Sequence, residues 1–509
     1  MNAMTRHNIQ RLGMSVRIGF DNDKYLKTQS EHIRERIQKF GGKLYLEFGG
    51  KLFDDYHASR VLPGFKPDSK ISMLMQLKDQ AEAIIAINSN DIERKKVRGD
   101  LGITYDLEAM RLIDSFMGRG INVCGVVLTR YADQRAAKAF EQKLVEQGIS
   151  VYHHYSIEGY PANIPLIVSD DGYGKNDFIK TTKPLVVVTA PGPGSGKMAV
   201  CLSQLYHENK NGNMAGYAKF ETFPIWNLPL NHPVNIAYEA ATADLNDKNM
   251  IDPYHMETYG KTTVNYNRDV EVFPVLNAML SKIMGKSPYN SPTDMGVNMA
   301  GNCICDDDAV RAAAKNEIIC RYFAALRSRK QGFVNDDIVT KIDVLMNQAG
   351  IKAEDRKVVA AVRERMKTVD MSVSAMELPD GTLVTGKSGE LIGASPALIL
   401  NALKVLGGIP DDIHLIPPDF FKPVQKMKLN YLGADNPRLN INDVLIALSI
   451  YASRDENAAK ALAQLPKLKG SDVHISVIPS SANETAWRKL GVNLTCEPRY
   501  KTACFFHIN

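Results

Sequence analysis

The chain has 509 residues, which is too long for one hydrophobic core and predicts about two to four domains. Hydrophobic residues make up 44% of it and charged residues 23%, as in an ordinary soluble globular protein. The 62 basic and 57 acidic side chains leave a formal net charge of +5, which is small for this length. Composition therefore gives no reason to expect a nucleic-acid partner.

Cysteine usage and hydropathy predict a cytoplasmic protein. The seven cysteines, an odd number, lie far apart in the sequence, which is typical of reduced thiols. No apolar run approaches the roughly 18 residues that a membrane-spanning helix requires. The first residues also lack the apolar core of a signal peptide. We therefore expect no membrane partner.

Residues 4–230 alternate between strand-like and helix-like segments. Short β-branched runs predict strands, and apolar residues three and four apart predict helices between them. The clearest helical face consists of Leu107, Met110, Leu112, Ile113 and Phe116. This alternation predicts an α/β domain with a doubly wound, mostly parallel sheet. The expected strands are Lys43–Phe48, Ala83–Asn88, Asn122–Thr129, Ser150–His154 and Pro184–Ala190; the expected helices are Thr28–Phe40, Ser69–Gln80, Leu107–Gly118 and Asp133–Gln147.

The rest of the chain has two further patterns. Residues 231–370 are mostly helical in pattern and are expected to form a helical domain. They contain the polar segment Lys286–Cys305, which we expect to be a long functional loop. Residues 371–509 mix short strands with helices and are expected to form a smaller α+β C-terminal domain. The expected helices of the middle part are Val234–Leu245, Val270–Met284, Asp307–Lys330, Asp336–Gln348 and Ala353–Val369.

The most informative segment of the sequence is a P-loop-like strand-loop-helix. The apolar run 185–189 is followed by a loop that contains Gly192, Gly194, Ser195 and Gly196, and then by Lys197 at the start of an expected helix. Glycines allow successive backbone N–H groups to turn inward around an anion, and the helix N-terminus adds further N–H groups. We expect the three glycines to shape this nest, and Ser195 and Lys197 to contact phosphate.

Two positions of this loop depart from the usual phosphate-binding pattern. Pro191 stands where the first glycine is usual, and Met198 stands where a hydroxyl normally helps to hold magnesium. The sequence therefore predicts phosphate or nucleotide binding and leaves the use of Mg²⁺ undecided. Two alternatives stay open at this stage: a tight turn that uses its glycines for packing alone, and a site for another anion such as carboxylate or sulfate.

The segment after the loop is rich in side chains that suit a binding site. Polar residues of these types bind phosphate, sugar or metal, although each one alone is more often a helix cap or a turn residue. Glu221, Asp244 and Asp252 are the candidates for a metal ligand or a general base. The candidate substrate-binding residues are Lys219, His232, Asn235, Arg268, Asp294 and Asn298, and the same stretch also contains His255, Asn265, Asn267 and Asp269.

Several long runs resemble the bacterial family known as domain of unknown function 1846. They are TTKPLVVVTAPGPGSGKMAVCLSQLYHE, AGYAKFETFPIWNLPLNHPVNIAYEAATADL, NYNRDVEVFPVL and SPTDMGVNM, with KLYLEFGGKLFDDYHASRVLPGF before them and NALKVLGGIPDD after them. The resemblance covers nearly the whole chain. It implies a cytosolic bacterial protein with an α/β part, a helical part and a smaller α+β part. It implies no reaction and no substrate, and it indicates that Pro191 and Met198 are the family's own form of the loop.

These observations predict a protein that binds a small phosphorylated ligand, with ATP or another nucleotide as the expected cofactor. The leading hypothesis is a nucleotide-dependent phosphotransferase or ligase that acts on a small molecule. The alternatives are a non-catalytic nucleotide or metabolite sensor and a structural protein whose glycine loop is only a turn. A homo-oligomer is neither indicated nor excluded. We further expect one cleft to be lined by Gly192–Lys197, Lys219–Glu221, Asn231–Asn235 and Lys286–Cys305.

Overall fold

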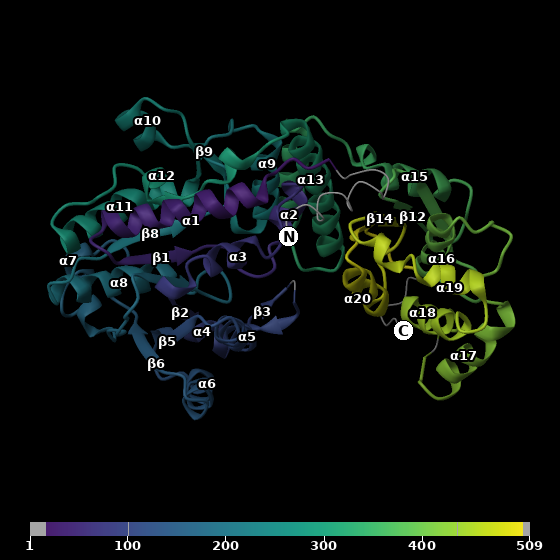
Figure 1. The fold of residues 1–509 in the computed structure, drawn as a ribbon, viewed down its shortest axis with the longest axis horizontal. Helices are drawn as coiled ribbons and strands as arrows, with labels where there is room; N and C mark the ends of the chain where they lie inside the picture. The colour runs from purple at the N-terminus through teal and green to yellow at the C-terminus, as the bar shows by residue number, and fades with distance from the viewer. Residues whose placement is uncertain (1–16, 100, 435, 502–509) are drawn as a thin grey trace, which may run out of the picture. The chain divides into compact units, whose positions relative to one another are not determined.

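The computed structural model describes residues 17–99, 101–434 and 436–501. Contacts between Cα atoms divide the chain into two compact units. The first, which we call the sheet unit, comprises Ile18–Glu239 and Asn246–Arg311. The second, the C-terminal unit, comprises Ala240–Leu245 and the residues from Ala312 onward (Figure 1). The domain boundaries predicted after residues 230 and 370 stay predictions.

The sheet unit is built on a seven-stranded sheet in which every neighbouring pair is parallel. The central strands are fully buried because they are covered on both faces, which explains their mostly apolar composition. The α/β prediction with a parallel sheet is confirmed. In spatial order the strands are β11 (Gly296–Val297), β8 (Gly216–Phe220), β1 (Leu44–Phe48), β7 (Leu185–Thr189), β2 (Ala81–Asn88), β5 (Asn122–Tyr131) and β6 (Val151–Tyr155).

The path of the chain through this sheet runs in both directions. From β1 the chain moves outward to β2, β5 and β6, and it then returns to place β7 between β1 and β2. From β7 it crosses β1 to reach β8, and later adds β11 at that edge. Strands β1 and β7 are thus neighbours whose following connections leave toward opposite edges. In open parallel sheets this is where ligands bind, beyond the carboxyl ends of the strands.

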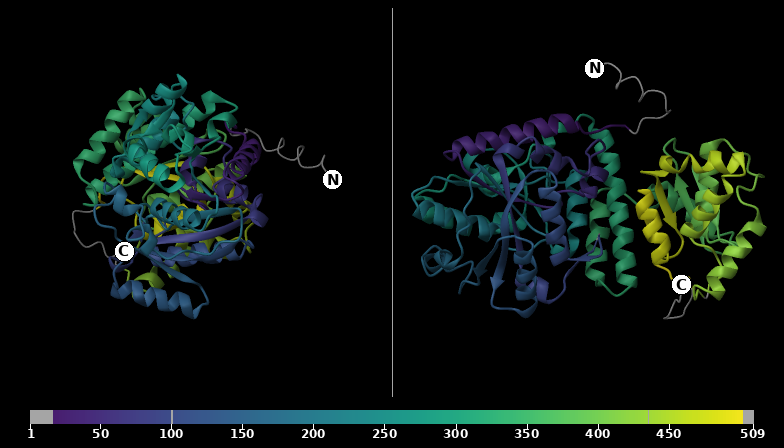
Figure 2. Two further views of the ribbon diagram at one scale, coloured as in Figure 1. Left: turned by 90° about the vertical axis from the view of Figure 1, so that its left-hand side faces the viewer. Right: turned by 60° about the horizontal axis from the view of Figure 1, so that its bottom comes forward.

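Helices surround the sheet. The long helix α1 lies beside β8 and β11 and packs on α3, and Figures 1 and 2 show it in purple along the sheet unit. Helix α8 packs on β1, β7 and β8, and α11 packs on α8. The helices of this unit are α1 (Asn22–Lys39), α2 (Tyr56–Val61), α3 (Ser69–Met75), α4 (Ser89–Glu93), α5 (Tyr105–Met117), α6 (Arg135–Glu146), α7 (Ile164–Ile167), α8 (Lys197–Lys210), α9 (Pro233–Ala241), α10 (Pro253–Tyr259), α11 (Asn267–Met284) and α12 (Pro292–Met295).

Helix α5 shows both the strength and the limit of the periodicity argument. Leu112, Ile113 and Phe116 are buried against Ile85 and Ile87 of β2, as the sequence predicts. Leu107 was expected on the same face, but 46% of its surface is exposed. The inner face is completed instead by Ala109 and by Glu108, whose carboxylate is neutralised by Arg98 and Arg111.

The segment Lys286–Cys305 is not the structureless loop that its composition predicts. It contains the short helix α12, which Ser291 caps by accepting a hydrogen bond from the N–H of Asp294. It then forms β11, which pairs with β8 through Gly296 and Val297. Likewise, the mostly helical pattern before it conceals the antiparallel pair β9 (Asn249–Ile251) and β10 (Val264–Tyr266).

The C-terminal unit contains a four-stranded mixed sheet in the order β13-β12-β14-β15. Strand β12 alternates between two cores: Met376 packs into the larger one with α16 and α18, and Val373 and Ala375 pack against α15. The elements are α13 (Asp307–Lys330, which begins in the sheet unit), α14 (Asp336–Gln348), α15 (Lys357–Met366), β12 (Val373–Glu377), β13 (Leu383–Lys387), α16 (Ala394–Gly407), α17 (Pro418–Asn430), α18 (Ile441–Tyr451), α19 (Glu456–Leu462), β14 (Asp472–Ile475), α20 (Ser481–Leu490) and β15 (Asn493–Cys496).

Two observations bear on the expectations about membranes and thiols. Among the described residues, no helix combines the length and the apolar character that crossing a bilayer demands. The cysteines in the same ranges are all free thiols.

Candidate functional site

The glycine loop lies at the carboxyl end of β7 and leads directly into α8. Gly194 and Gly196 have φ angles of +78° and +87°, a left-handed conformation that L-residues with a side chain adopt only at a cost. A Cβ atom at Gly192 would collide with the hydroxyl group of Tyr105, whereas one at Gly194 would meet no atom within 4 Å. The tip of the loop therefore borders open space.

Four carbonyl groups of this loop, those of Gly192, Gly194, Ser195 and Gly196, accept hydrogen bonds. The Oγ of Ser195 donates to the carbonyl of Gly192 over 2.9 Å, and Nδ2 of Asn88, at the end of β2, donates to that of Gly194 over 3.3 Å. The Oγ1 of Thr129, on β5, donates to the carbonyl of Ser195 over 2.8 Å. The carbonyl of Gly196 accepts the N–H of Val200 in the first turn of α8. Neighbouring strands thus fix the loop in one conformation.

The N–H groups of the same loop are not engaged. From Gly194 through Ala199, six successive backbone N–H groups donate no hydrogen bond to any residue within the described ranges. Because four of the loop's carbonyl groups are engaged and these N–H groups are not, the loop offers backbone donors at the edge of the sheet. This is the arrangement that binds phosphate and other anions in proteins.

Lys197 adds a cation to this edge. Its side chain makes no ion pair and no hydrogen bond with the described part of the chain. Burial lowers the pKa of Lys197, while the nearby carboxylate of Glu47 raises it and the cations Lys219 and Arg268 lower it further. Glu47 comes from the end of β1, where its Oε2 accepts a hydrogen bond from the Tyr217 hydroxyl over 2.8 Å. The loop after β7 and the end of β1 therefore bring their charges together.

Lys219 is the centre of a second group of charges at the end of β8. Its ammonium group lies 2.9 Å from Oε1 of Glu221 and also binds the Asp269 carboxylate and the Tyr266 hydroxyl. Burial alone would lower the pKa of Lys219, but Asp269 and Glu221 outweigh it and keep the group protonated. One of the predicted substrate-binding residues is thus already paired with protein carboxylates.

Glu221 is a carboxyl group with an unusually high pKa. Burial raises its pKa to about 7, and the charge of Asp269 acts in the same direction, while Lys219 opposes both. A carboxyl group that titrates near neutral pH can both accept and donate a proton, which is the requirement for general acid–base catalysis. Glu221 was one of the residues predicted for this role.

Glu221 also lines a cavity of about 440 Å³ inside the sheet unit. The walls come from α1, from the end of β8 and the residues after it, from α10 and β10, and from the segment around α12 and β11. Two further predicted residues, Asp294 and Asn298, line it as well. The full lining is His32, Arg36, Glu221, Pro224, Trp226, His255, Tyr259, Lys261, Val264, Asn265, Thr293, Asp294, Gly296, Asn298 and Met299.

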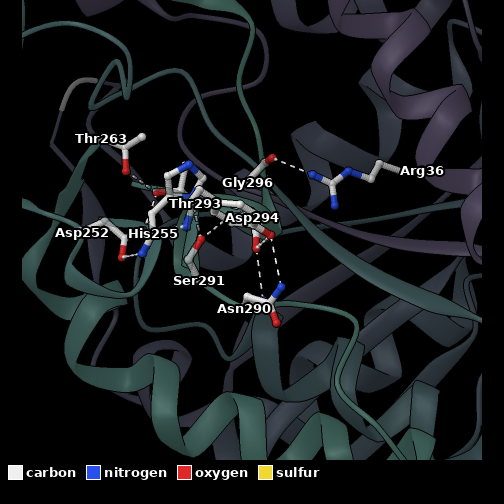
Figure 3. A network of polar contacts seen from close by, with 10 residues as sticks. Arg36, Asp252, His255, Thr263, Asn290, Ser291, Thr293, Asp294 and Gly296 are labelled. Atoms are coloured by element: carbon white, nitrogen blue, oxygen red, sulfur yellow. Dashed lines mark hydrogen bonds and ion pairs between the residues drawn. The ribbon is translucent and has the colours of Figure 1, made fainter. Parts of the chain in front are cut away.

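A polar network holds the wall formed by α10 and α12 (Figure 3). Asp252 accepts the N–H of His255 with one oxygen, and with the other it accepts the Thr293 N–H and hydroxyl, at 3.1 and 2.6 Å. The Nδ1 of His255 lies 2.9 Å from Oγ of Ser291. Both oxygens of Asp252 are therefore used to cap α10 and to tie it to α12.

The carboxylate of Asp294 completes this network. It accepts hydrogen bonds from the Tyr259 hydroxyl over 2.9 Å and from the N–H of Asn290 over 3.1 Å. Its other oxygen lies 3.6 Å from Nδ1 of His255. The imidazole is thereby held through its Nδ1 side, and its Nε2 has no partner among the described residues.

Four of the remaining predicted residues have structural partners, and Asp244 is exposed. The buried His232 contacts Asp307 through Nε2 at 3.0 Å, and the amide of Asn235 bonds both the N–H and the carbonyl of Ile225. Arg268 forms a two-pronged ion pair with Asp247. Asn298 binds the Pro224 carbonyl, and Asp244 is exposed in a short 3₁₀-helix that belongs to the C-terminal unit.

The single cleft expected from the sequence is found only in part. The cavity unites Glu221 with Asp294 and Asn298 of the segment Lys286–Cys305, but Gly192–Lys197 and Asn231–Asn235 are not among its lining residues. Lys219 links the glycine loop to the cavity. Its charge lowers the pKa of Lys197, and its ammonium group contacts Glu221.

Sequence reasoning did not select Arg36, Glu47 or Lys261 as site residues. Arg36 lies on a regular amphipathic helix and Glu47 within an apolar strand, so neither carries a local signal. A charged residue inside an otherwise buried strand, as Glu47 is, would have been the available clue. His255 and Trp226 stood in the polar segment but had nothing to distinguish them from turn residues. Within the described ranges, no group of three or more His, Cys, Asp or Glu side chains is placed to hold a metal ion.

The fold and the site define an α/β protein with a parallel sheet, charged groups gathered at its carboxyl edge and a separate mixed-sheet C-terminal unit. Two family models match the chain: domain of unknown function DUF1846, N-terminal, over residues 18–350, and its C-terminal counterpart over residues 354–506. The chain belongs to this family.

Its curated relatives are UPF0371 proteins. Those of Streptococcus thermophilus and Streptococcus uberis are 55% identical to it over 482 and 485 residues, which cover 95% of this chain and 98% of each relative. That of Corynebacterium urealyticum is 55% identical over 488 residues, which cover 96% and 98%. Among solved structures, the ADP form of the Aeropyrum pernix ORC2 protein aligns at 10% identity with a TM-score of 0.16 over 84% of each chain, and nothing follows from so low a score.

Proposed function

We propose that this protein binds the phosphate group of a small phosphorylated ligand at the glycine loop and Lys197, with a nucleotide such as ATP as the leading class. The observation that carries the proposal is the asymmetry of the loop. Four of its carbonyl groups accept hydrogen bonds, from Asn88, Thr129, Ser195 and Val200, while the six N–H groups from Gly194 through Ala199 donate to no residue that the structure describes. An anion is the ligand that satisfies many converging donors at once.

The position of the loop in the sheet supports the same proposal. Strands β1 and β7 are neighbours whose connections leave in opposite directions, and the loop follows β7 at that point. Ligands of open parallel sheets bind at such a position. Lys197, unpaired and partly withdrawn from water, supplies the charge that a phosphate group needs, because a buried cation without a partner is otherwise unfavourable.

A transferase or ligase reaction is the form of this function that Glu221 favours over a sensor. A sensor needs only the nest of N–H groups. Catalysis needs in addition a group that exchanges protons near neutral pH, and burial gives Glu221 a pKa of about 7. In this form of the proposal Glu221 accepts the proton of an acceptor hydroxyl or amine.

The test is a binding titration of the full chain with ATP, glucose 6-phosphate and inorganic phosphate, each with and without Mg²⁺. A ligand present at about 100 times its dissociation constant should stabilise the folded protein by about 2.7 kcal/mol, which a thermal-shift assay detects. Lys197→Ala removes a charge-assisted contact of about 1.5–3 kcal/mol, so affinity should fall about tenfold to a hundredfold.

Lys210→Ala is the matched control. Lys210 lies at the opposite end of the same helix, where it pairs with the exposed Asp170. Its loss removes the same charge from α8 and should leave the affinity unchanged. If Lys197→Ala and Lys210→Ala bind every one of these ligands as the unmodified protein does, the glycine loop is not a phosphate site.

A further inference from the structure

The 440 Å³ cavity of the sheet unit contains two cations that no carboxylate neutralises. Arg36, half-buried on α1, donates a long hydrogen bond of 3.4 Å to the Gly296 carbonyl, and its guanidinium lies 5.7 Å from the centre of the Tyr289 ring. Lys261 at the rim has no partner among the described residues. Neither forms an ion pair with any residue that the structure describes. The acids of the cavity are in contrast engaged, Glu221 by Lys219 and Asp294 by the Tyr259 hydroxyl and the Asn290 N–H.

The wall across from Arg36 presents an imidazole edge. His255 is held on its Nδ1 side by Ser291, and Figure 3 shows Arg36 reaching the network from α1 on the other side of Gly296. Because Ser291 is fully buried and also caps α12, the ring orientation is fixed by the fold. The free Nε2 of His255 is thus available to a molecule in the cavity.

The other surfaces of the cavity suit a small organic molecule. Trp226 contributes an aromatic side chain whose Nε1 donates to the Asn298 carbonyl over 2.8 Å, so the indole is fixed in place. Tyr259, Val264 and Met299 add further apolar area. A volume of about 440 Å³ lies in the range of pockets that enclose metabolites.

We propose that this cavity is a second ligand site, which binds a small organic anion through Arg36 and Lys261 and places its polar end against His255 and Glu221. The anionic group is a carboxylate or a phosphate, since a guanidinium pairs with either in the same two-pronged geometry. The proposal goes beyond phosphate binding at the glycine loop and stands independently of it.

The chain contains two tryptophans, which makes a site-specific test simple. Trp226 lines the cavity, and Trp487 is fully buried in the core of the C-terminal unit. In protein labelled with 5-fluorotryptophan, the ¹⁹F signal of Trp226 should shift saturably with sodium succinate or sodium phosphate, and that of Trp487 should not. Succinamide, which has the succinate skeleton without its charges, should shift neither. Trp487→Phe assigns the two signals.

Arg36→Gln should lower the affinity for the anion that binds by at least about tenfold, because it removes a charge-assisted contact. Arg34→Gln is the matched control: Arg34 lies on the same helix but donates to the Gln76 carbonyl outside the cavity, and its loss should change nothing. Lys197→Ala should also leave the Trp226 titration unchanged.

Three results would overturn the proposal. They are a Trp226 signal that none of the anions moves, equal affinity in Arg36→Gln and the unmodified protein, and a phosphate response that Lys197→Ala abolishes but Arg36→Gln preserves. The last result would place the phosphate at the glycine loop, so the two sites are distinguished by their own variants.

Discussion

Two buried glutamates show how differently the same side chain behaves in this protein. Burial alone would raise the pKa of Glu497, but hydrogen bonds from His474 and Arg363 lower it to about 2. At Glu221 burial prevails, with Asp269 acting in the same direction, and the pKa rises to about 7. Glu497 has partners that satisfy its charge, whereas Glu221 shares its one cation, Lys219, with a second carboxylate. A glutamate that shares its cation with another carboxylate, as Glu221 does, can exchange a proton near neutral pH.

This difference predicts how Glu221→Gln changes stability with pH. The folded state holds the Glu221 proton more tightly than the unfolded state, whose pKa is near 4.5. The stabilising effect of that proton is complete below pH 4.5 and is lost as the pH rises toward 7. Glutamine has no proton to lose. The free energy of unfolding of the variant should therefore rise relative to that of the unmodified protein across this window, by at most about 1.4 kcal/mol per pH unit.

Urea unfolding followed by Trp226, in a Trp487→Phe background for both proteins, measures the effect at intervals between pH 4.5 and 7. A constant stability difference between the two proteins throughout this window would show that Glu221 titrates normally.

At the scale of elements, the glycine loop depends on backbone geometry and on one close approach. Alanine at Gly192 would collide with the Tyr105 hydroxyl, whereas alanine at Gly194 meets no atom but must adopt a φ of +78°. We expect Gly194→Ala to cost about 1–2 kcal/mol in unfolding free energy and Gly192→Ala to cost more. Urea unfolding followed by Trp226 in the Trp487→Phe background gives both values.

Tyr105→Phe is the control for this comparison, because it removes the hydroxyl oxygen that would lie 2.2 Å from the new Cβ, although the ring carbon Cζ would still lie 2.5 Å from it. In the Tyr105→Phe background the cost of Gly192→Ala should be smaller, while that of Gly194→Ala should be unchanged. Equal costs for Gly192→Ala in both backgrounds would mean that the Tyr105 hydroxyl does not set the cost.

The sequence predicts elements well where burial dictates composition. Buried parallel strands such as Leu185–Thr189 must be continuously apolar, and long helices such as Asp307–Lys330 repeat one apolar face over many turns. It predicts secondary structure poorly where pairing with a segment far along the chain determines it. Gly296–Val297 becomes a strand only because β8 offers an unpaired edge, and α17 contains Pro423, which argues against a helix.

The same distinction holds for the site. The glycine loop is contiguous in sequence and could be recognised there, although Asn88 and Thr129, which hold it, come from other strands. Lys219 and Glu221 fall on one side of a strand end by simple alternation. Arg36 and His255 lie more than two hundred positions apart and meet only across the finished fold. No local pattern could have joined them.

At the scale of the whole molecule, Lys197 has no ion-pair partner among the described residues, so the proposed phosphate binding would be an acid–base event. Burial lowers the pKa of this lysine from its usual 10.5, so between the lowered value and 10.5 the free protein carries part of it in the neutral form. A phosphate group favours the charged form and draws a proton from solution. Affinity should fall as the pH rises through this window, with an uptake of up to one proton per ligand. Titration calorimetry in two buffers of different ionisation enthalpy measures that uptake directly. Identical heats in both buffers would mean that ligand binding does not change the protonation of Lys197.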